Sequence, residues 1–65
     1  MALTPDQLMQ QSQRLRIRAK DTRETAQAMT HPSLRRMMLD MATSYEKMAG
    51  QLERAATYTS HPQQA

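Results

Sequence analysis

The sequence of 65 residues contains no cysteine, tryptophan or phenylalanine and only one glycine. The absence of cysteine excludes disulfide bonds and thiolate zinc sites, which often stabilise chains this short. The scarcity of aromatic residues leaves a β-sheet little to pack with, whereas the abundant Ala, Met, Gln, Arg and Leu favour helix. We therefore expect an all-α protein.

Long apolar runs are also missing. No run approaches the roughly 18 residues that span a bilayer, and the first residues lack the charged start and apolar stretch of a signal peptide. We therefore expect a soluble, cytoplasmic protein with no membrane partner. Nine Lys and Arg against six Asp and Glu give a net charge of +3, a modest excess that permits attraction to nucleic acid without requiring it.

The segment Thr4 to Gln7 indicates the start of a first helix, predicted over about residues 5–29. Thr4 can cap the exposed backbone N–H groups, Gln7 can reach back to it, and Pro5 suits the first helical position. Core candidates then recur every four and three residues, and most of them are small. The predicted contact line of this helix is Leu8, Ser12, Leu15, Ala19, Thr22, Ala26 and Met29.

A turn is predicted at residues 30–32, because Pro32 forces His31 out of the helical region and then suits the start of a second helix over about 33–59. Either Thr30 or His31 should cap that helix. Residues 61–65 are expected to form a disordered tail. The predicted contact line of the second helix is Leu34, Met38, Met41, Tyr45, Met48, Leu52 and Ala55, with Ala42, Ala49 and Ala56 as a flanking stripe.

One segment also fits a strand. Residues 14–20 alternate polar and apolar side chains, which is the period of a half-buried strand. The segment has no turn residues on either side and no second strand to pair with, and it keeps the helical phase of its surroundings. We therefore favour a helix, in which Ile17 is exposed.

A lone hairpin of this length is expected to be marginal, since below about 70–80 residues a single core rarely contributes more than roughly 3–5 kcal/mol. The apolar face of the second helix is wider than the first helix can cover. We therefore expect a homo-oligomer, a dimer or tetramer with a coiled-coil-like four-helix bundle, and another helical protein as the alternative partner. The predicted interface is Leu34, Met37, Met38, Met41, Ala42, Tyr45, Met48, Ala49 and Leu52.

A basic segment in the first helix makes nucleic-acid binding the alternative function. Its cations are Arg14, Arg16, Arg18, Lys20 and Arg23. On a helix, alternate residues diverge by about 200° and wrap around the axis instead of lining one groove. No aromatic residue is interleaved to stack on bases. A solvated basic surface is the simpler interpretation.

The seven methionines raise a third hypothesis, a soft-metal site for copper, because a thioether is a soft ligand. Met37, Met38 and Met41, with His31 or Met48, are the candidates, although methionine more often fills gaps in a core. We expect no cofactor.

No catalytic group is expected. His31 and His61 each precede a proline and suit local turns. Asp40, Glu46 and Glu53 are predicted on the outer side of the second helix, spaced for pairs such as Arg36 with Asp40.

The stretch from Arg23 through the turn to Leu39, followed by residues 45–49, resembles a pattern in short uncharacterised bacterial proteins. Those proteins have a helix, a proline-containing turn, a Met-Leu run and a Tyr one or two turns later. This chain departs from the pattern at His31 and Ser33, where the usual turn residues are acidic. The resemblance implies a helical hairpin and brings no activity with it. We therefore expect a non-enzymatic protein that self-associates and acts as an interaction or regulatory module.

Overall fold

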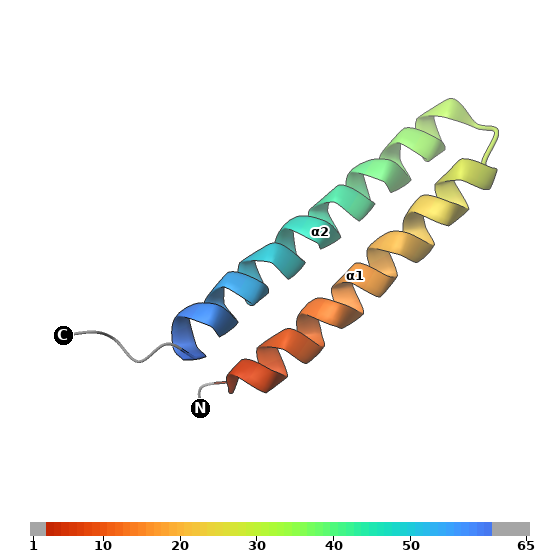
Figure 1. The fold of residues 1–65 in the computed structure, drawn as a ribbon. Helices are drawn as coiled ribbons and strands as arrows, with labels where there is room; N and C mark the ends of the chain where they lie inside the picture. The colour runs from red at the N-terminus through yellow and green to blue at the C-terminus, as the bar shows by residue number, and fades with distance from the viewer. Residues whose placement is uncertain (1–2, 61–65) are drawn as a thin grey trace.

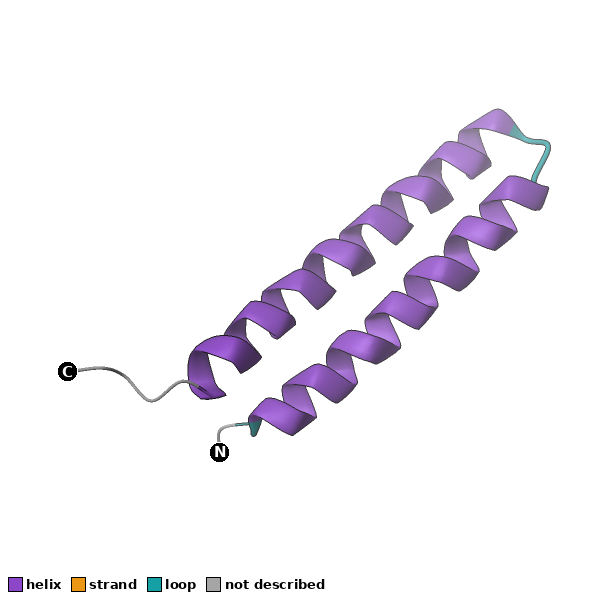
Figure 2. Cartoon of the chain, in the orientation of Figure 1, coloured by secondary structure: helices purple, strands orange, loops and turns teal. Residues whose placement is uncertain are grey.

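The computed structural model describes residues 3–60, which form two helices, α1 (Pro5–Ala28) and α2 (Pro32–Ser60). They run antiparallel, side by side, and a short turn joins them at one end of a rod of 54 × 18 × 17 Å (Figure 1). Helix accounts for almost all of the described chain, and residues 3–60 contain no strand (Figure 2). The all-α hairpin is therefore confirmed, and the strand alternative for residues 14–20 is wrong. The predicted tail, residues 61–65, lies outside the described residues.

The start of α1 carries the predicted cap. The backbone N–H of Thr4 donates to Gln7 Oε1 at 2.9 Å, and the N–H of Gln7 donates to Thr4 Oγ1 at 3.1 Å. Pro5 takes the first helical position, where its missing N–H costs nothing, and Asp6 places a negative charge near the positive end of the helix dipole. The reciprocal bonds satisfy backbone donors that have no partner within the helix.

The turn consists of residues 29–31. Met29 leaves the helical region with φ −82° and ψ 140°. His31 caps α2: its ring Nδ1 accepts from the N–H of Leu34 at 3.3 Å, and its carbonyl accepts from the N–H of Arg35 at 3.0 Å. Of the two predicted cap residues, the structure therefore uses His31.

The contact between the helices is made of small side chains. None of the buried residues is larger than threonine. Small side chains let two helices approach closely, but they bury little apolar area. The buried residues are Ser12, Ala19, Thr22 and Ala26 on α1, and Ala42, Ala49 and Ala56 on α2.

The prediction centred the contact line of α2 on the wrong side of the helix. The alanine stripe expected on the flank is the centre of the contact, while Leu34, Met41 and Met48 are 42–45% exposed. Ala55 is exposed as well. Met38, Tyr45 and Leu52 lie between these two groups and are half-buried. On α1, by contrast, Ser12, Ala19, Thr22 and Ala26 are buried, and Leu8, Leu15 and Met29 are half-buried beside them.

Candidate interaction surface

The buried stripe divides the hairpin into two sides. On a helix, the residue three positions after a given residue lies on one side of it, and the residue four positions after lies on the other side. On α1, Arg16 and Arg23 follow buried residues by four, whereas Leu15 follows a buried residue by three. The same rule places Glu46 and Glu53 of α2 beside the arginines, and Tyr45 and Leu52 on the other flank, which Met38 shares because it lies seven residues before Tyr45. We call these two flanks the ionic side and the apolar side.

Glu53 accepts more hydrogen bonds than Glu46, the other glutamate of the ionic side. Arg16 Nε donates to Glu53 Oε2 at 2.5 Å and Arg16 Nη2 donates to its Oε1 at 2.6 Å. The hydroxyl of Ser12, which is fully buried, also donates to Oε2. These hydrogen bonds, the one from Arg16 first and the one from Ser12 second, lower the pKa of Glu53 from 4.5 to about 2. The same pairing raises the pKa of Arg16.

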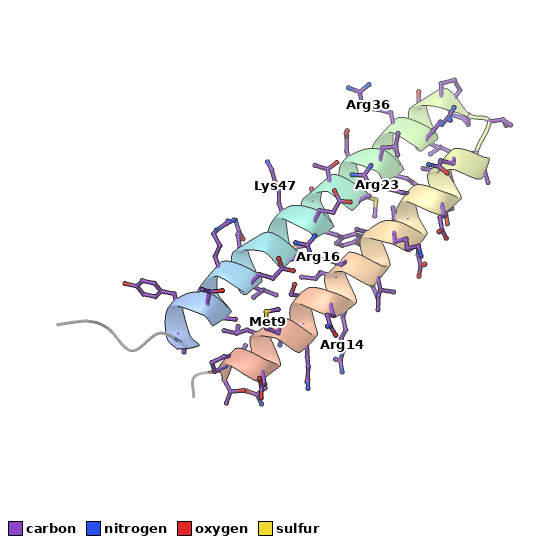
Figure 3. All side chains as sticks on the ribbon, in the orientation of Figure 1. Met9, Arg14, Arg16, Arg23, Arg36 and Lys47 are labelled. Atoms are coloured by element: carbon purple, nitrogen blue, oxygen red, sulfur yellow. The ribbon has the colours of Figure 1, made fainter. Side chains whose placement is uncertain are left out.

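A second ion pair lies seven residues later on α1 and seven residues earlier on α2. Arg23 Nε donates to Glu46 Oε2 at 2.9 Å, and its Nη2 donates to Glu46 Oε1 at 2.7 Å. The same Nη2 reaches Thr43 Oγ1 at 3.3 Å. The hydrogen bonds from Arg23 lower the pKa of Glu46, and the pairing raises the pKa of Arg23. Figure 3 shows Arg16 and Arg23 reaching from α1 towards α2.

The prediction that Glu46 and Glu53 lie on the outer side of α2 is therefore wrong, because both face α1. A signal for this arrangement was present in the sequence. Arg16 and Arg23 are separated by seven residues, and so are Glu46 and Glu53, so each pair occupies one side of its helix. The pair of Arg36 with Asp40 does form within α2, at 3.7 Å between two exposed side chains.

The apolar side carries most of the large apolar side chains that are exposed in the described chain. Among them, Leu34 is 45% exposed, Met37 57%, and Met41 and Met48 42% each. These four lie outside the half-buried row of Met38, Tyr45 and Leu52, so an apolar surface extends along nearly the whole of α2. Exposed apolar surface of this extent on a small protein usually marks an interface.

The residues predicted to form the interface divide into three groups. Ala42 and Ala49 are fully buried against α1, so they are not available to a partner. Met38, Tyr45 and Leu52 are half-buried at the edge of the hairpin contact. The predicted interface residues that are exposed are Leu34, Met37, Met41 and Met48.

The predicted nucleic-acid residues do not form one surface. Arg16 and Arg23 are engaged by glutamates on the ionic side. Arg18 lies on the apolar side, with its guanidinium carbon 5.9 Å from the centre of the Tyr45 ring, a cation–π contact. Arg14 points away from α2 (Figure 3). Lys20 lines a hollow on the ionic side together with Glu24 and Glu46.

Residues 3–60 contain no group of three or more His, Asp or Glu side chains that could hold a metal ion. For the copper hypothesis, His31 Nδ1 is already the acceptor of the helix cap, while Met37 and Met41 are exposed. Neither described helix is long and apolar enough to cross a membrane.

No family model matches the sequence, and no curated protein or solved structure is significantly similar to it.

Proposed function

We propose that this protein is a non-enzymatic helical module that self-associates through the apolar side of α2, forming a four-helix bundle, and that it serves as an interaction or regulatory protein. The observation that carries the proposal is the exposure of Leu34, Met37, Met41 and Met48 along one side of a single helix. Methionine suits such a surface, because its unbranched thioether side chain adapts to the shape of a partner.

The weakness of the hairpin core supports this proposal. The contact between α1 and α2 buries mainly alanine side chains, and within residues 3–60 no large apolar residue is fully buried. Burial of apolar area is the main favourable term in folding, and each ordered residue costs conformational entropy. A second copy docked on the apolar side would bury the large side chains that the hairpin leaves in water.

The test is a pair of charge insertions. Replacing Met41 and Met48 together by Glu places two carboxylates within the apolar side, so we expect the oligomer to dissociate and much of the helicity to be lost. The double variant Gln10→Glu/Gln13→Glu is the matched control, because it adds the same charge at exposed positions of α1. Sedimentation gives the native mass and circular dichroism gives the helix content.

The unsubstituted chain provides a second readout, in case the double variant does not fold. Its native mass and helicity should both rise with concentration, because association stabilises the folded hairpin by mass action. A chain that is fully helical and monomeric at every concentration would contradict self-association, as would a Met41→Glu/Met48→Glu variant of unchanged mass and helicity.

A further inference from the structure

The outer surface of α2 carries no charge along three adjacent rows of its helix. Positions seven residues apart form such rows on a helix that packs at a seven-residue repeat. Within residues 34–59, every charged side chain lies outside these three rows. The rows are Leu34, Met41, Met48 and Ala55; Met38, Tyr45, Leu52 and Thr59; and Met37, Ser44, Gln51 and Tyr58.

The central row is nearly symmetric about its own midpoint. Met41 and Met48 lie on either side of residues 44 and 45, and Leu34 and Ala55 lie at equal distances further out. Two copies of α2 packed antiparallel about a two-fold axis at this midpoint would therefore place Met41 against Met48 of the other copy, and Leu34 against Ala55. The central contacts would all be apolar.

On α1, two residues of opposite charge lie beside the apolar side. Arg14 and Asp21 are seven residues apart and occupy the same row, and both are exposed. Neither forms an ion pair with another residue of the described chain. Together with Ile17 and Arg18 they line one shallow hollow. An antiparallel second copy centred between Ile17 and Arg18 would bring Arg14 of each chain to Asp21 of the other.

The two midpoints lie close to each other along the rod. The contact of Arg18 with the Tyr45 ring, at 5.9 Å, joins the middle of the Arg14–Asp21 segment to the middle of the charge-free surface. A single axis perpendicular to the helices can therefore pass close to both. If the two turns lay at the same end, α2 would instead face α1 of the other copy, and Arg14 and Asp21 would face uncharged rows.

We infer that the partner on the apolar side is a second copy in the antiparallel arrangement, with α2 against α2, the two turns at opposite ends, and two Arg14–Asp21 ion pairs between the chains. This inference rests on the proposed self-association and specifies its geometry. The two Arg18 guanidinium groups come near the axis, where each lies against its own Tyr45 ring.

The absence of cysteine in the sequence makes the geometry testable with single thiols. Ser44→Cys places a thiol next to the axis, so it should cross-link to its counterpart under mild oxidation or with a short bis-maleimide. Ser33→Cys is the matched control at the turn end, and both serines are exposed. In the antiparallel dimer the two thiols of the Ser33→Cys variant would be separated by more than roughly 30 Å, estimated from the rise of about 1.5 Å per residue, and should not cross-link.

A charge-swap series tests the ion pairs independently. Arg14→Asp or Asp21→Arg alone should weaken the dimer by roughly two- to thirtyfold, as expected for two exposed ion pairs, whereas the double variant should regain most of the affinity. A monomeric native chain would overturn the proposed function together with this inference. A dimer that cross-links through Ser33→Cys, or that is indifferent to both the thiol position and the charge swap, would overturn only the inferred geometry.

Discussion

Glu53 and Arg16 form a doubly hydrogen-bonded ion pair across the helix contact, with N–O distances of 2.5 and 2.6 Å between residues that lie 37 positions apart in the sequence. A fork of this kind constrains direction as well as distance, because both guanidinium nitrogens must meet both carboxylate oxygens. With Arg23 and Glu46 in the same relation, it defines which face of α2 turns towards α1. The ion pairs thereby leave the methionines of α2 exposed.

The stability of the hairpin should depend on pH through Glu53. Its pKa is about 2 in the folded chain, below the ordinary 4.5, so the unfolded chain takes up this proton at a higher pH than the folded chain. The contribution is therefore complete above about pH 5 and is lost as the pH falls towards 2. Thermal unfolding followed by circular dichroism should show that Glu53→Gln lowers the Tm most near neutral pH, with the difference shrinking in acid.

Glu24→Gln is the control for that experiment, because Glu24 is exposed and has no ion pair in the described chain. It should change the Tm far less than Glu53→Gln at neutral pH. A Glu53→Gln deficit of constant size from neutral pH down to pH 2 would contradict the assigned role of the Glu53 carboxylate.

The alanine stripe should not tolerate larger side chains. Ala49 is fully buried where the two helices meet, so Ala49→Leu has to push them apart and should destabilise the protein by about 1–3 kcal/mol. Ala28→Leu makes the same change at an exposed position and should stay within about 0.5 kcal/mol. Urea unfolding of both variants provides the comparison, and equal effects would mean that the stripe is not the close contact between the helices.

Gly50 is expected to limit the stability of α2. It has ordinary helical geometry, and an added Cβ would lie 3.6 Å from Arg54 Nη1, which is a normal contact with a flexible side chain. Gly50→Ala should therefore stabilise the protein by about 0.5–1 kcal/mol through backbone entropy alone. Ala55→Gly, the reverse change at an exposed site of the same helix, should cost a similar amount. Chemical denaturation measures both, and a destabilised Gly50→Ala protein would show that the space beside Gly50 is needed.

The cap at the start of α2 can be improved. His31 Nδ1 accepts from the N–H of Leu34 at 3.3 Å, which is long for a hydrogen bond, and the first turn of α2 contains no acidic residue. His31→Asp supplies a better acceptor and a negative charge at the positive end of the helix dipole, so it should add about 0.5–1 kcal/mol. Thr30→Asp places the same charge one residue outside the cap and should contribute less. Equal gains in Tm from the two variants would indicate a general charge effect.

Sequence patterns were most informative where the interactions are local. The capping box of Thr4 and Gln7 and the break at Pro32 depend on neighbours within one helical turn, and the exposure of Ile17 follows from the helical period of α1. All three were predicted correctly. The contact line of α1 was also predictable, because this helix has only one continuous face of small and apolar residues along which it can pack.

The side of α2 that faces α1 could not be predicted in the same way. This helix has two rows at the same seven-residue spacing, on either side of Met38, Tyr45 and Leu52: one of alanines and one containing Met41 and Met48. Hydrophobicity favours the methionines as the core, and that criterion gave the wrong face. Spacing alone does not choose between the rows, because both satisfy it.

The sequence by itself determined that the chain forms two helices and, to within one residue, where they begin and end and where the chain turns, because caps, proline and periodicity act over a few residues. Only the tertiary structure decided which side of α2 meets α1. That choice depends on the surface of the other helix: small residues at Ser12, Ala19 and Ala26 accept only small residues at close approach, and Arg16 and Arg23 require carboxylates opposite them. Packing the alanine stripe satisfies both requirements, and the methionines remain exposed on the apolar side.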